Sequence, residues 1–203
     1  KILDVGSIPP LLTALLRKKG YCDITAMDPG VDLYKSYFEL KKVNTVANSI
    51  FNIDEAAVFN QYDLVTFCEV IEHLSGDLRV ALQAVARFVK PGGYLLLTTP
   101  NLRSIPGYMG LVGFQSGLAS KYKETVKAQY DRKDRDGFYG HLREFTVKEI
   151  VDLLSSHGFQ LVNSSFQPDY RPAKDPISKL SSLFELAFPE LRLFGRHMFK
   201  KNI

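Results

Sequence analysis

The chain has 203 residues, of which 45% are hydrophobic and 12% aromatic, and its 26 basic and 22 acidic side chains give a formal net charge of +4. This length suits one domain, residues 1–203, and the apolar content excludes both intrinsic disorder and a small disulfide-stabilised protein. The densest basic segment, Lys121–Arg135, also contains several acidic residues, so its charge does not indicate a nucleic-acid partner.

Cysteine usage and hydropathy favour a cytoplasmic protein. Cys22 and Cys68 lie far apart and belong to no Cys-x-x-Cys motif, which predicts a reducing compartment rather than a zinc site or a disulfide framework. No apolar run approaches the roughly 18 residues of a membrane span, although Met109–Phe114 is apolar enough to contact a membrane surface. Because the sequence starts on a strand-like run at Lys1 without a methionine, we expect a preceding segment to be missing.

Short apolar or β-branched runs alternate with helical patterns along the chain. Strands are predicted at Ile2–Val5, Ile24–Met27, Val43–Ala47, Leu64–Cys68, Tyr94–Thr98, Phe159–Ser164 and Arg196–Lys200. Helices are predicted at Pro10–Lys19, Val31–Leu40 and Gly76–Phe88, after Thr146, and at Ile177–Phe188. This alternation predicts an α/β domain with a largely parallel sheet, helices on both faces and ligands at the carboxyl edge of the strands.

Two helices carry specific expectations. The helix at Pro10–Lys19 should bury the leucines that recur at helical spacing, which are Leu11, Leu12, Leu15 and Leu16. Thr146 and Glu149 form the Ser/Thr-x-x-Glu pattern of a capping box, so a helix should begin directly after Thr146.

The alternation of strands and helices is interrupted between Pro100 and Glu144, in a stretch too long for a simple connection. We interpret residues 101–144 as a lid inserted after the fifth strand, with a role in substrate recognition. The amphipathic helix predicted at Ile177–Phe188 should pack on the core, with contact to a membrane or a greasy substrate as the alternative.

Six motifs occur in an order and spacing typical of one family. They are Leu3-Asp4-Val5-Gly6, Asp28, Tyr62-Asp63-Leu64-Val65, Glu69-Val70-Ile71-Glu72-His73-Leu74, Val89-Lys90-Pro91-Gly92-Gly93 and Thr99-Pro100-Asn101. Together they resemble the class I S-adenosylmethionine-dependent methyltransferases, and within them the branch that includes ubiquinone-biosynthesis-like O-methyltransferases. The resemblance covers nearly the whole chain. It implies a Rossmann-like, doubly wound sheet of seven strands with the last strand antiparallel.

The same motifs suggest a site for S-adenosylmethionine. Gly6 follows the first strand and lacks a Cβ, so backbone amides of the loop can approach the methionine end of the cofactor. Asp28, at the end of the second strand, would accept both ribose hydroxyls, although Asp-Pro-Gly is also ordinary turn chemistry. By resemblance, the other cofactor-binding residues are Asp4 near the amino group, Ser7 in the loop, Ser49 and Ile50 beside the adenine, and Cys68 and Glu69 at the sulfonium.

The loop after the first strand departs from the family pattern. The family usually has Gly-x-Gly-x-Gly, whereas this chain has Gly6-Ser7-Ile8-Pro9-Pro10. Ile8 is β-branched and precedes a proline, which restricts it to an extended conformation. This departure supports an alternative hypothesis, a catalytically inactive scaffold or partner subunit in which Ile8 projects into the space of the methionine moiety.

A second group of residues suggests acceptor chemistry. Glu69, Glu72 and His73 have the i, i+3, i+4 spacing that places side chains on one side of a helical turn, and His141 follows at the end of the insert. These four residues offer ligands for a divalent metal, and the pattern resembles metal-dependent small-RNA 3′-terminal 2′-O-methyltransferases. Two alternatives stay open. One is a metal-free catalytic role for His73 or His141, and the other is a purely structural role in which residues 141–144 form a surface ion pair.

The sequence therefore predicts an enzyme that transfers the methyl group of S-adenosylmethionine to an oxygen of a small-molecule or lipid-like acceptor. The inactive scaffold is one alternative. A metal-dependent RNA 2′-O-methyltransferase is another, based on the Glu-His pattern and the lysines between Lys121 and Lys133, although the acidic residues among them disfavour nucleic acid. If His141 arrives with the insert, closure of the lid should complete the site.

Overall fold

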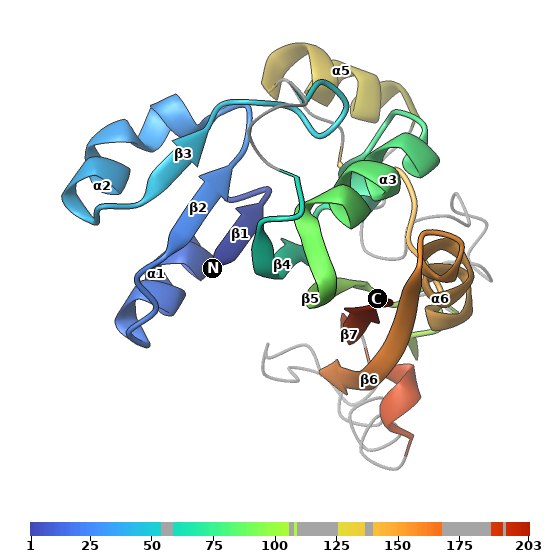
Figure 1. Ribbon diagram of the computed structural model, residues 1–203. Coiled ribbons are helices and arrows are strands. Elements are labelled where there is room, and N and C mark those ends of the chain that lie inside the picture. The colour runs from blue at the N-terminus through green and yellow to red at the C-terminus, as the bar shows by residue number, and fades with distance from the viewer. Residues whose placement is uncertain (54–58, 106–107, 109–125, 137–139, 168–187, 193) are drawn as a thin grey trace.

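The structure, a computed structural model, describes residues 1–53, 59–105, 108, 126–136, 140–167, 188–192 and 194–203. Seven strands of this part of the chain form one sheet in the order β3-β2-β1-β4-β5-β7-β6 (Figure 1). They are β1 (Ile2–Val5), β2 (Ile24–Met27), β3 (Asn44–Val46), β4 (Tyr62–Cys68), β5 (Val89–Pro100), β6 (Phe159–Gln167) and β7 (Phe194–Lys201). Because β7 is antiparallel to both of its neighbours and the other pairings are parallel, the predicted sheet is confirmed.

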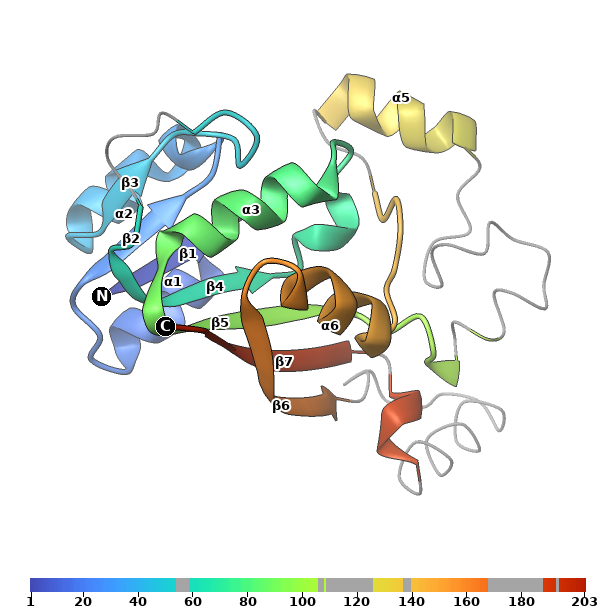
Figure 2. The same ribbon diagram turned by 45° about the vertical axis from the view of Figure 1, so that its right-hand side comes forward.

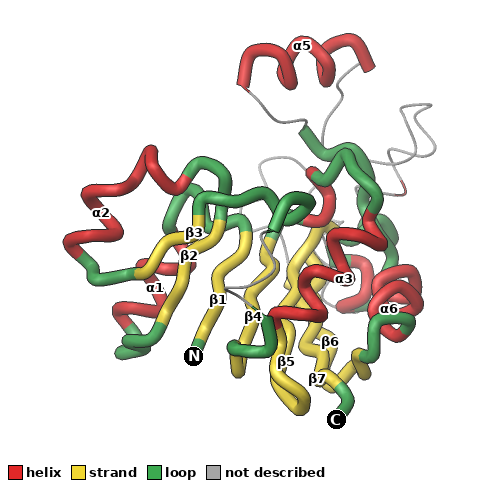
Figure 3. The backbone as a smooth tube through the Cα atoms, turned by 45° about the horizontal axis from the view of Figure 1, so that its top comes forward, coloured by secondary structure: helices red, strands yellow, loops and turns green. Residues whose placement is uncertain are grey.

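Helices cover both faces of the sheet (Figure 2). The described helices are α1 (Leu11–Lys18), α2 (Lys35–Leu40), α3 (Leu78–Phe88), α5 (Val126–Asp136) and α6 (Val147–Ser155), with 3₁₀ helices η1 (Val31–Tyr34), η2 (Ile71–His73) and η3 (Pro189–Leu191). Helix α5 stands apart from the sheet, beyond the edge at which the parallel strands end (Figure 3). The predicted helix at Val31–Leu40 is thus a 3₁₀ turn followed by an α-helix.

Successive side chains of β1 point to opposite faces of the sheet, so this strand contributes to two hydrophobic clusters. Ile2 points to the smaller cluster, which includes Phe38 of α2, whereas Leu3 and Val5 belong to the larger cluster with Leu82 of α3. All four residues of β1 are buried, as expected for a central parallel strand that is covered on both faces. The carboxyl ends of β1, β4 and β5 therefore meet at one edge of a well-packed sheet.

The prediction that α1 buries Leu11 and Leu15 was wrong. These side chains are 75% and 51% exposed, and Thr13 is the fully buried residue of the helix. The Thr13 hydroxyl donates a hydrogen bond of 2.7 Å to the buried carboxylate of Asp4. This contact turns the Thr13 side of α1 towards the sheet, and residues two positions away then face outwards because successive helical residues are about 100° apart.

The predicted start of α6 is confirmed. The Thr146 hydroxyl accepts from the amide of Glu149, and the Glu149 carboxylate accepts from the amide of Thr146, which completes the capping box. Ile150 and Leu154 of this helix are buried in the larger cluster. The cap therefore fixes the point at which the chain returns from the insert to the sheet.

Only part of the predicted lid lies among the described residues. Its two ends are joined next to β5, where Asn101 and Phe145 form a parallel bridge and the amide of Leu102 donates to the carbonyl of Phe145 at 3.1 Å. The apolar run Met109–Phe114 lies outside the described residues. The helix predicted at Ile177–Phe188 lies outside them up to residue 187. No described helix is long and apolar enough to cross a membrane.

A buried histidine that the sequence analysis did not single out lies in β7. His197 is 2% exposed, its Nδ1 lies 3.0 Å from the Ser164 hydroxyl of β6, and its ring contacts Phe166 edge-on. Burial lowers the pKa of His197 to about 4, because a charged ring would lose its hydration there. The histidine is consequently neutral in the folded protein at neutral pH.

We predict that this histidine makes the fold sensitive to acid. The unfolded chain binds a proton at His197 near pH 6.5, whereas the folded chain does so only near pH 4, so the free energy of unfolding falls as the pH drops through this range. The loss should reach about 3 kcal/mol near pH 4. Urea denaturation of His197→Asn between pH 4 and 7 should show a shallower decline than the wild type, and equal slopes would contradict the prediction.

Candidate functional site

The loop after β1 requires glycine at position 6. Gly6 has a φ of +74°, and its amide donates to the carbonyl of Met27, at the end of β2, at 2.9 Å. A Cβ atom on Gly6 would overlap Cγ2 of Val70, which leads from β4 into η2. The loop after β1 therefore lies directly against the segment after β4.

Two further residues of this loop, Ser7 and Ile8, have buried or partly buried side chains. Ser7 is 3% exposed, and its hydroxyl oxygen has no hydrogen-bond partner among the described residues. The side chain of Ile8 is partly buried and packs against the smaller hydrophobic cluster. Ile8, which supported the inactive-scaffold hypothesis, thus has a structural role in the core, while Ser7 keeps a buried polar atom available at the loop.

Asp4 links the elements around this loop through hydrogen bonds of its buried carboxylate. Its side chain is 3% exposed, and its two carboxylate oxygens accept hydrogen bonds of 2.7 Å from the hydroxyls of Thr13 in α1 and Thr66 in β4. Burial raises the pKa of Asp4, and the two hydroxyl hydrogen bonds oppose that increase. Asp4 therefore ties β1, α1 and β4 together at the base of the predicted cofactor site.

Asp28 lies at the end of β2, on the other side of the same loop. Its carboxylate accepts a hydrogen bond of 2.7 Å from the amide of Gly30, which confirms the predicted turn role. Burial raises the pKa of Asp28, and backbone hydrogen bonds from Gly30 and Ile8 act in the opposite direction. The bond from Ile8 connects this carboxylate to the loop after β1.

Three other residues predicted to bind the cofactor occupy different environments. Ser49 is partly buried, and its hydroxyl accepts from the amide of Phe51 at 3.3 Å, whereas the side chain of Ile50 is buried in the larger cluster. Cys68 ends β4, and burial raises the pKa of its thiol to about 12. Cys68 therefore stays protonated at neutral pH and is not a nucleophile.

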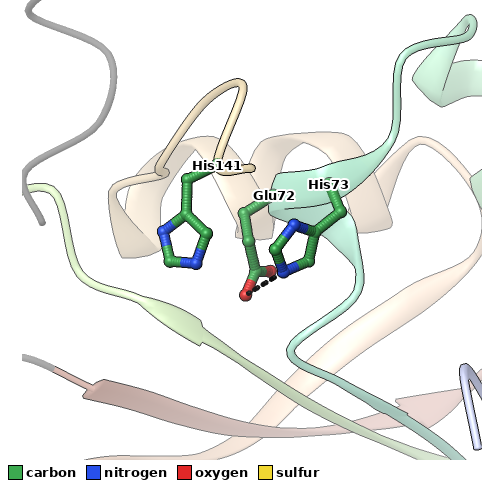
Figure 4. A group of neighbouring side chains, drawn as sticks. All are labelled: Glu72, His73 and His141. Carbon is green, nitrogen blue, oxygen red and sulfur yellow. Dashed lines mark ion pairs between the residues drawn. The ribbon is translucent and has the colours of Figure 1, made fainter. Parts of the chain in front are cut away.

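The structure brings together three of the four residues predicted to bind a metal. Glu72 and His73 come from η2, and His141 comes from the end of the insert (Figure 4). Each offers one ligand atom, and these atoms lie within 4.8 Å of one another. Two imidazoles and one carboxylate form a ligand set that transition metals favour.

Backbone contacts hold the segment with His141 against η2. The amides of Leu142 and Arg143 donate to the carbonyl of Glu72 at 2.8 and 3.4 Å, and Nδ1 of His73 lies 3.2 Å from the carbonyl of Gly140. The rings of His73 and His141 meet edge-on, with centroids 4.9 Å apart. The end of the insert that carries His141 is therefore attached to η2 in this structure.

Glu72 is fully buried, which is unusual for a carboxyl group. Its Oε2 accepts from the Thr99 hydroxyl of β5 at 3.1 Å, whereas Oε1 has no hydrogen-bond partner among the described residues and lies 3.9 Å from Nε2 of His73. Burial, with the nearby Glu69 and Glu144 carboxylates, raises the pKa of Glu72 to about 8. The group therefore favours a proton or a cation beside Oε1.

The contact of His73 determines which of its ring nitrogens carries the lone pair. A carbonyl can only accept, so Nδ1 of His73 donates to Gly140 and the neutral ring has its lone pair on Nε2. Figure 4 shows Nε2 directed to the Glu72 carboxylate. This is the arrangement in which a histidine presents one nitrogen to a metal while a carbonyl holds the other.

Glu69 is not part of the three-residue group, and the expected single helical turn from Glu69 to His73 was wrong. Glu69 has a φ of +56°, and η2 begins only at Ile71. This left-handed conformation turns the chain, and the exposed Glu69 carboxylate accepts from the Thr98 hydroxyl at 2.8 Å. Glu69 acts on Glu72 through its charge rather than as a neighbour on one helix face.

The proposed surface ion pair in residues 141–144 was also wrong, because His141 and Glu144 are 7% and 0% exposed. Sequence reasoning did not assign Glu144 or Thr99 to the site. Glu144 lies three residues after His141. This spacing alone does not predict that the two side chains pair, because the sequence does not show that both are buried. Thr99 belongs to the motif Thr99-Pro100-Asn101, but its contact with Glu72 depends on the pairing of β4 with β5.

Comparison with known proteins identifies the family of this chain. The family model described as a methyltransferase domain matches residues 1–164, so the chain belongs to the methyltransferase-domain family. It is 30% identical over 137 residues to a ubiquinone biosynthesis O-methyltransferase of Cronobacter sakazakii, covering 64% of this chain and 54% of that protein. The enzyme of the same name from Pectobacterium carotovorum is 31% identical over 117 residues, covering 56% and 48%.

The chain spans about half the length of these curated relatives. Among solved structures, the 1,6-didemethyltoxoflavin N1-methyltransferase of Burkholderia thailandensis matches with a TM-score of 0.61 at 16% identity. That match covers 100% of this chain and 71% of the other. At this identity the likeness shows the shared Rossmann-like fold, which confirms the fold expected from the motifs.

We predict that Gly6→Ala destabilises the protein through two separable effects. The positive φ should cost about 1–2 kcal/mol, and overlap with Val70 should add roughly as much again. Gly20→Ala is a matched control, because Gly20 has a φ of +93° and nothing within 4 Å of a Cβ. Urea denaturation of both variants should show the larger loss for Gly6→Ala, and equal losses would contradict a tight contact between the two loops.

Proposed function

We propose that this chain is an S-adenosylmethionine-dependent methyltransferase domain that methylates an oxygen of a small-molecule or lipid-like acceptor. In this proposal, Glu72, His73 and His141 hold a divalent cation beside the cofactor. The observation that carries the proposal is the three-residue group of ligand atoms at the carboxyl edge, next to the loop of Gly6. The curated relatives are named as ubiquinone biosynthesis O-methyltransferases, which supports an oxygen as the acceptor atom.

The cofactor would lie over the loop after β1. Gly6 permits close approach of the backbone, and the buried Ser7 hydroxyl is available to a polar group of the methionine moiety. Asp28 would bind the ribose hydroxyls with the oxygen capacity that its turn hydrogen bond leaves, since a carboxylate accepts about four hydrogen bonds. Asp4 would act indirectly, because two threonine hydroxyls already hold its oxygens.

Cofactor and acceptor would be neighbours because one short segment connects their sites. Val70 packs against Gly6 in the cofactor loop, and Glu72 follows two residues later. Methyl transfer needs the acceptor oxygen in line with the sulfur–methyl bond, and the sulfonium is already activated. The acceptor oxygen would take the methyl group from the sulfur and give its hydroxyl proton to a base at the site or to water, which leaves S-adenosylhomocysteine.

The residues present fit a divalent cation. Oε1 of Glu72 is a buried acceptor with no protein partner among the described residues, and the two imidazoles favour ions such as Mn²⁺, Fe²⁺, Co²⁺ or Zn²⁺ over Mg²⁺. A bound cation would supply a positive charge that holds the acceptor oxygen and lowers the pKa of its hydroxyl group. Glu72, His73 and His141 would orient the acceptor, and without a cation either histidine would serve as the general base.

The described surface gives less support to an RNA acceptor. Helix α5 includes the whole described part of the basic segment, and its Lys127 is paired with Asp131 at 2.6 Å. Acidic residues along this helix would repel phosphates.

Both cysteines are free thiols, which suits the proposed cytoplasmic location.

Asp28→Asn should separate the ribose role from the turn role. Asparagine keeps an oxygen that can accept from Gly30 but loses the charge that strengthens bonds to ribose hydroxyls. We expect unchanged thermal stability and S-adenosylhomocysteine binding weakened by about tenfold or more, measured by calorimetry. Unchanged affinity in a folded Asp28→Asn protein would restrict this residue to its turn role.

Removal of one proposed ligand should affect the cation and the cofactor differently. His141→Ala should weaken Mn²⁺ binding by about 100-fold or more and lower kcat similarly, while calorimetry shows S-adenosylhomocysteine affinity within about threefold of wild type. His157→Ala is the control, because His157 bonds to Leu153 in α6 and is not in the three-residue group. It should leave both affinities unchanged.

The cation and the general-base mechanisms predict different effects of a chelator. If a cation holds the acceptor, EDTA should abolish methyl transfer and Mn²⁺ should restore it. Activity that persists in EDTA but falls in His73→Ala and His141→Ala would replace the cation with a general base. Full activity of both variants in EDTA would show that the acceptor binds elsewhere.

A further inference from the structure

Glu144 is a buried carboxyl group next to the proposed site. It is fully buried, and its Oε1 lies 3.2 Å from Nδ1 of His141. Acidic side chains are seldom buried without a partner, because removing a carboxylate from water is costly. The pair with His141 gives this burial a chemical reason.

The pair also determines how His141 is protonated. A carboxylate oxygen only accepts, so Nδ1 of His141 carries the hydrogen and the lone pair of the neutral ring is on Nε2. In Figure 4 a nitrogen of the His141 ring is turned towards the Glu72 carboxylate. With Nδ1 held by Glu144, Nε2 is the nitrogen with which His141 can bind a cation or accept a proton.

The backbone holds Glu144 firmly enough for this task. On one side, the amides of Leu142 and Arg143 bond to the carbonyl of Glu72. On the other side, Phe145 forms the bridge with Asn101 at the end of β5. Glu144 therefore lies between two attachment points, and its carboxylate has a defined position relative to η2.

From this geometry we infer that Glu144 is a positioning residue that fixes the ring orientation and the tautomer of His141 for cation binding. This inference rests on the proposed function, because it takes the three-residue group as the cation site. In this role Glu144 is not itself one of the cation ligands. It acts through His141, as the backbone carbonyl of Gly140 does through His73.

The first test measures the tautomer in the cation-free protein, so it does not depend on the proposed function. Long-range ¹H–¹⁵N NMR spectra, assigned by comparison with His141→Ala, should show His141 protonated on Nδ1 in the wild type. In Glu144→Ala the Nε2-protonated form should become detectable. A wild-type ring protonated on Nε2, or the same tautomer in both proteins, would overturn the inference.

The second test measures Mn²⁺ affinity by calorimetry. Glu144→Ala should weaken binding by about 10- to 100-fold, and Glu144→Gln should restore part of it, because the amide oxygen can still accept from Nδ1. S-adenosylhomocysteine affinity should change little in either variant. Wild-type Mn²⁺ affinity in a folded Glu144→Ala protein would overturn the inference.

A control addresses a general loss of stability. Glu149→Ala removes the capping box of α6 in the same part of the fold, where the Glu149 carboxylate bonds to Thr146 and Arg143. It should lower the melting temperature without weakening Mn²⁺ binding, and equal weakening would show that Glu144 acts only through stability. If the wild type binds no Mn²⁺, the proposed function fails and the inferred role in cation binding fails with it, while the NMR result still reports whether Glu144 orients His141.

Discussion

The carboxyl group of Glu72 has no access to solvent, and within the described part of the chain hydrogen bonds satisfy only one of its oxygens. A charged carboxylate in this position needs a compensating partner, which is why burial and neighbouring acids raise its pKa. The surrounding structure concentrates suitable partners at the unsatisfied oxygen. His73 and His141 approach it from two segments far apart in sequence, and backbone hydrogen bonds from the second segment fix that approach.

Much of the architecture is encoded in local patterns. Each predicted strand is present in the sheet, because short β-branched runs between helical segments are typical of parallel sheets that are buried on both faces. The helix start at Thr146 is likewise a local signal, since its capping box needs only residues three positions apart. Glu72 and His73 were singled out by their place shortly after a strand, at the ligand edge, together with the Glu-His pattern of their motif.

The features that could not be predicted depend on contacts between distant residues. Leu11 faces solvent because Thr13 bonds to Asp4, a contact that helical periodicity does not contain. Glu69 lies outside the three-residue group because its backbone is left-handed. This conformation is uncommon for a glutamate and has no local sequence signal. The role of Glu144 depends on burial by segments that the sequence does not show to be adjacent. Such long-range constraints decide the details of the site, whereas local patterns decide its place in the fold.

We propose that the group of Glu72, His73 and His141 is built for a cation next to the cofactor. The most direct measurement is an anomalous difference map at the manganese edge, from crystals grown with Mn²⁺ and S-adenosylhomocysteine. We predict one strong peak about 2.2 Å from Oε1 of Glu72 and from Nε2 of both His73 and His141. Crystals with bound S-adenosylhomocysteine and no peak among these three side chains would contradict the claim.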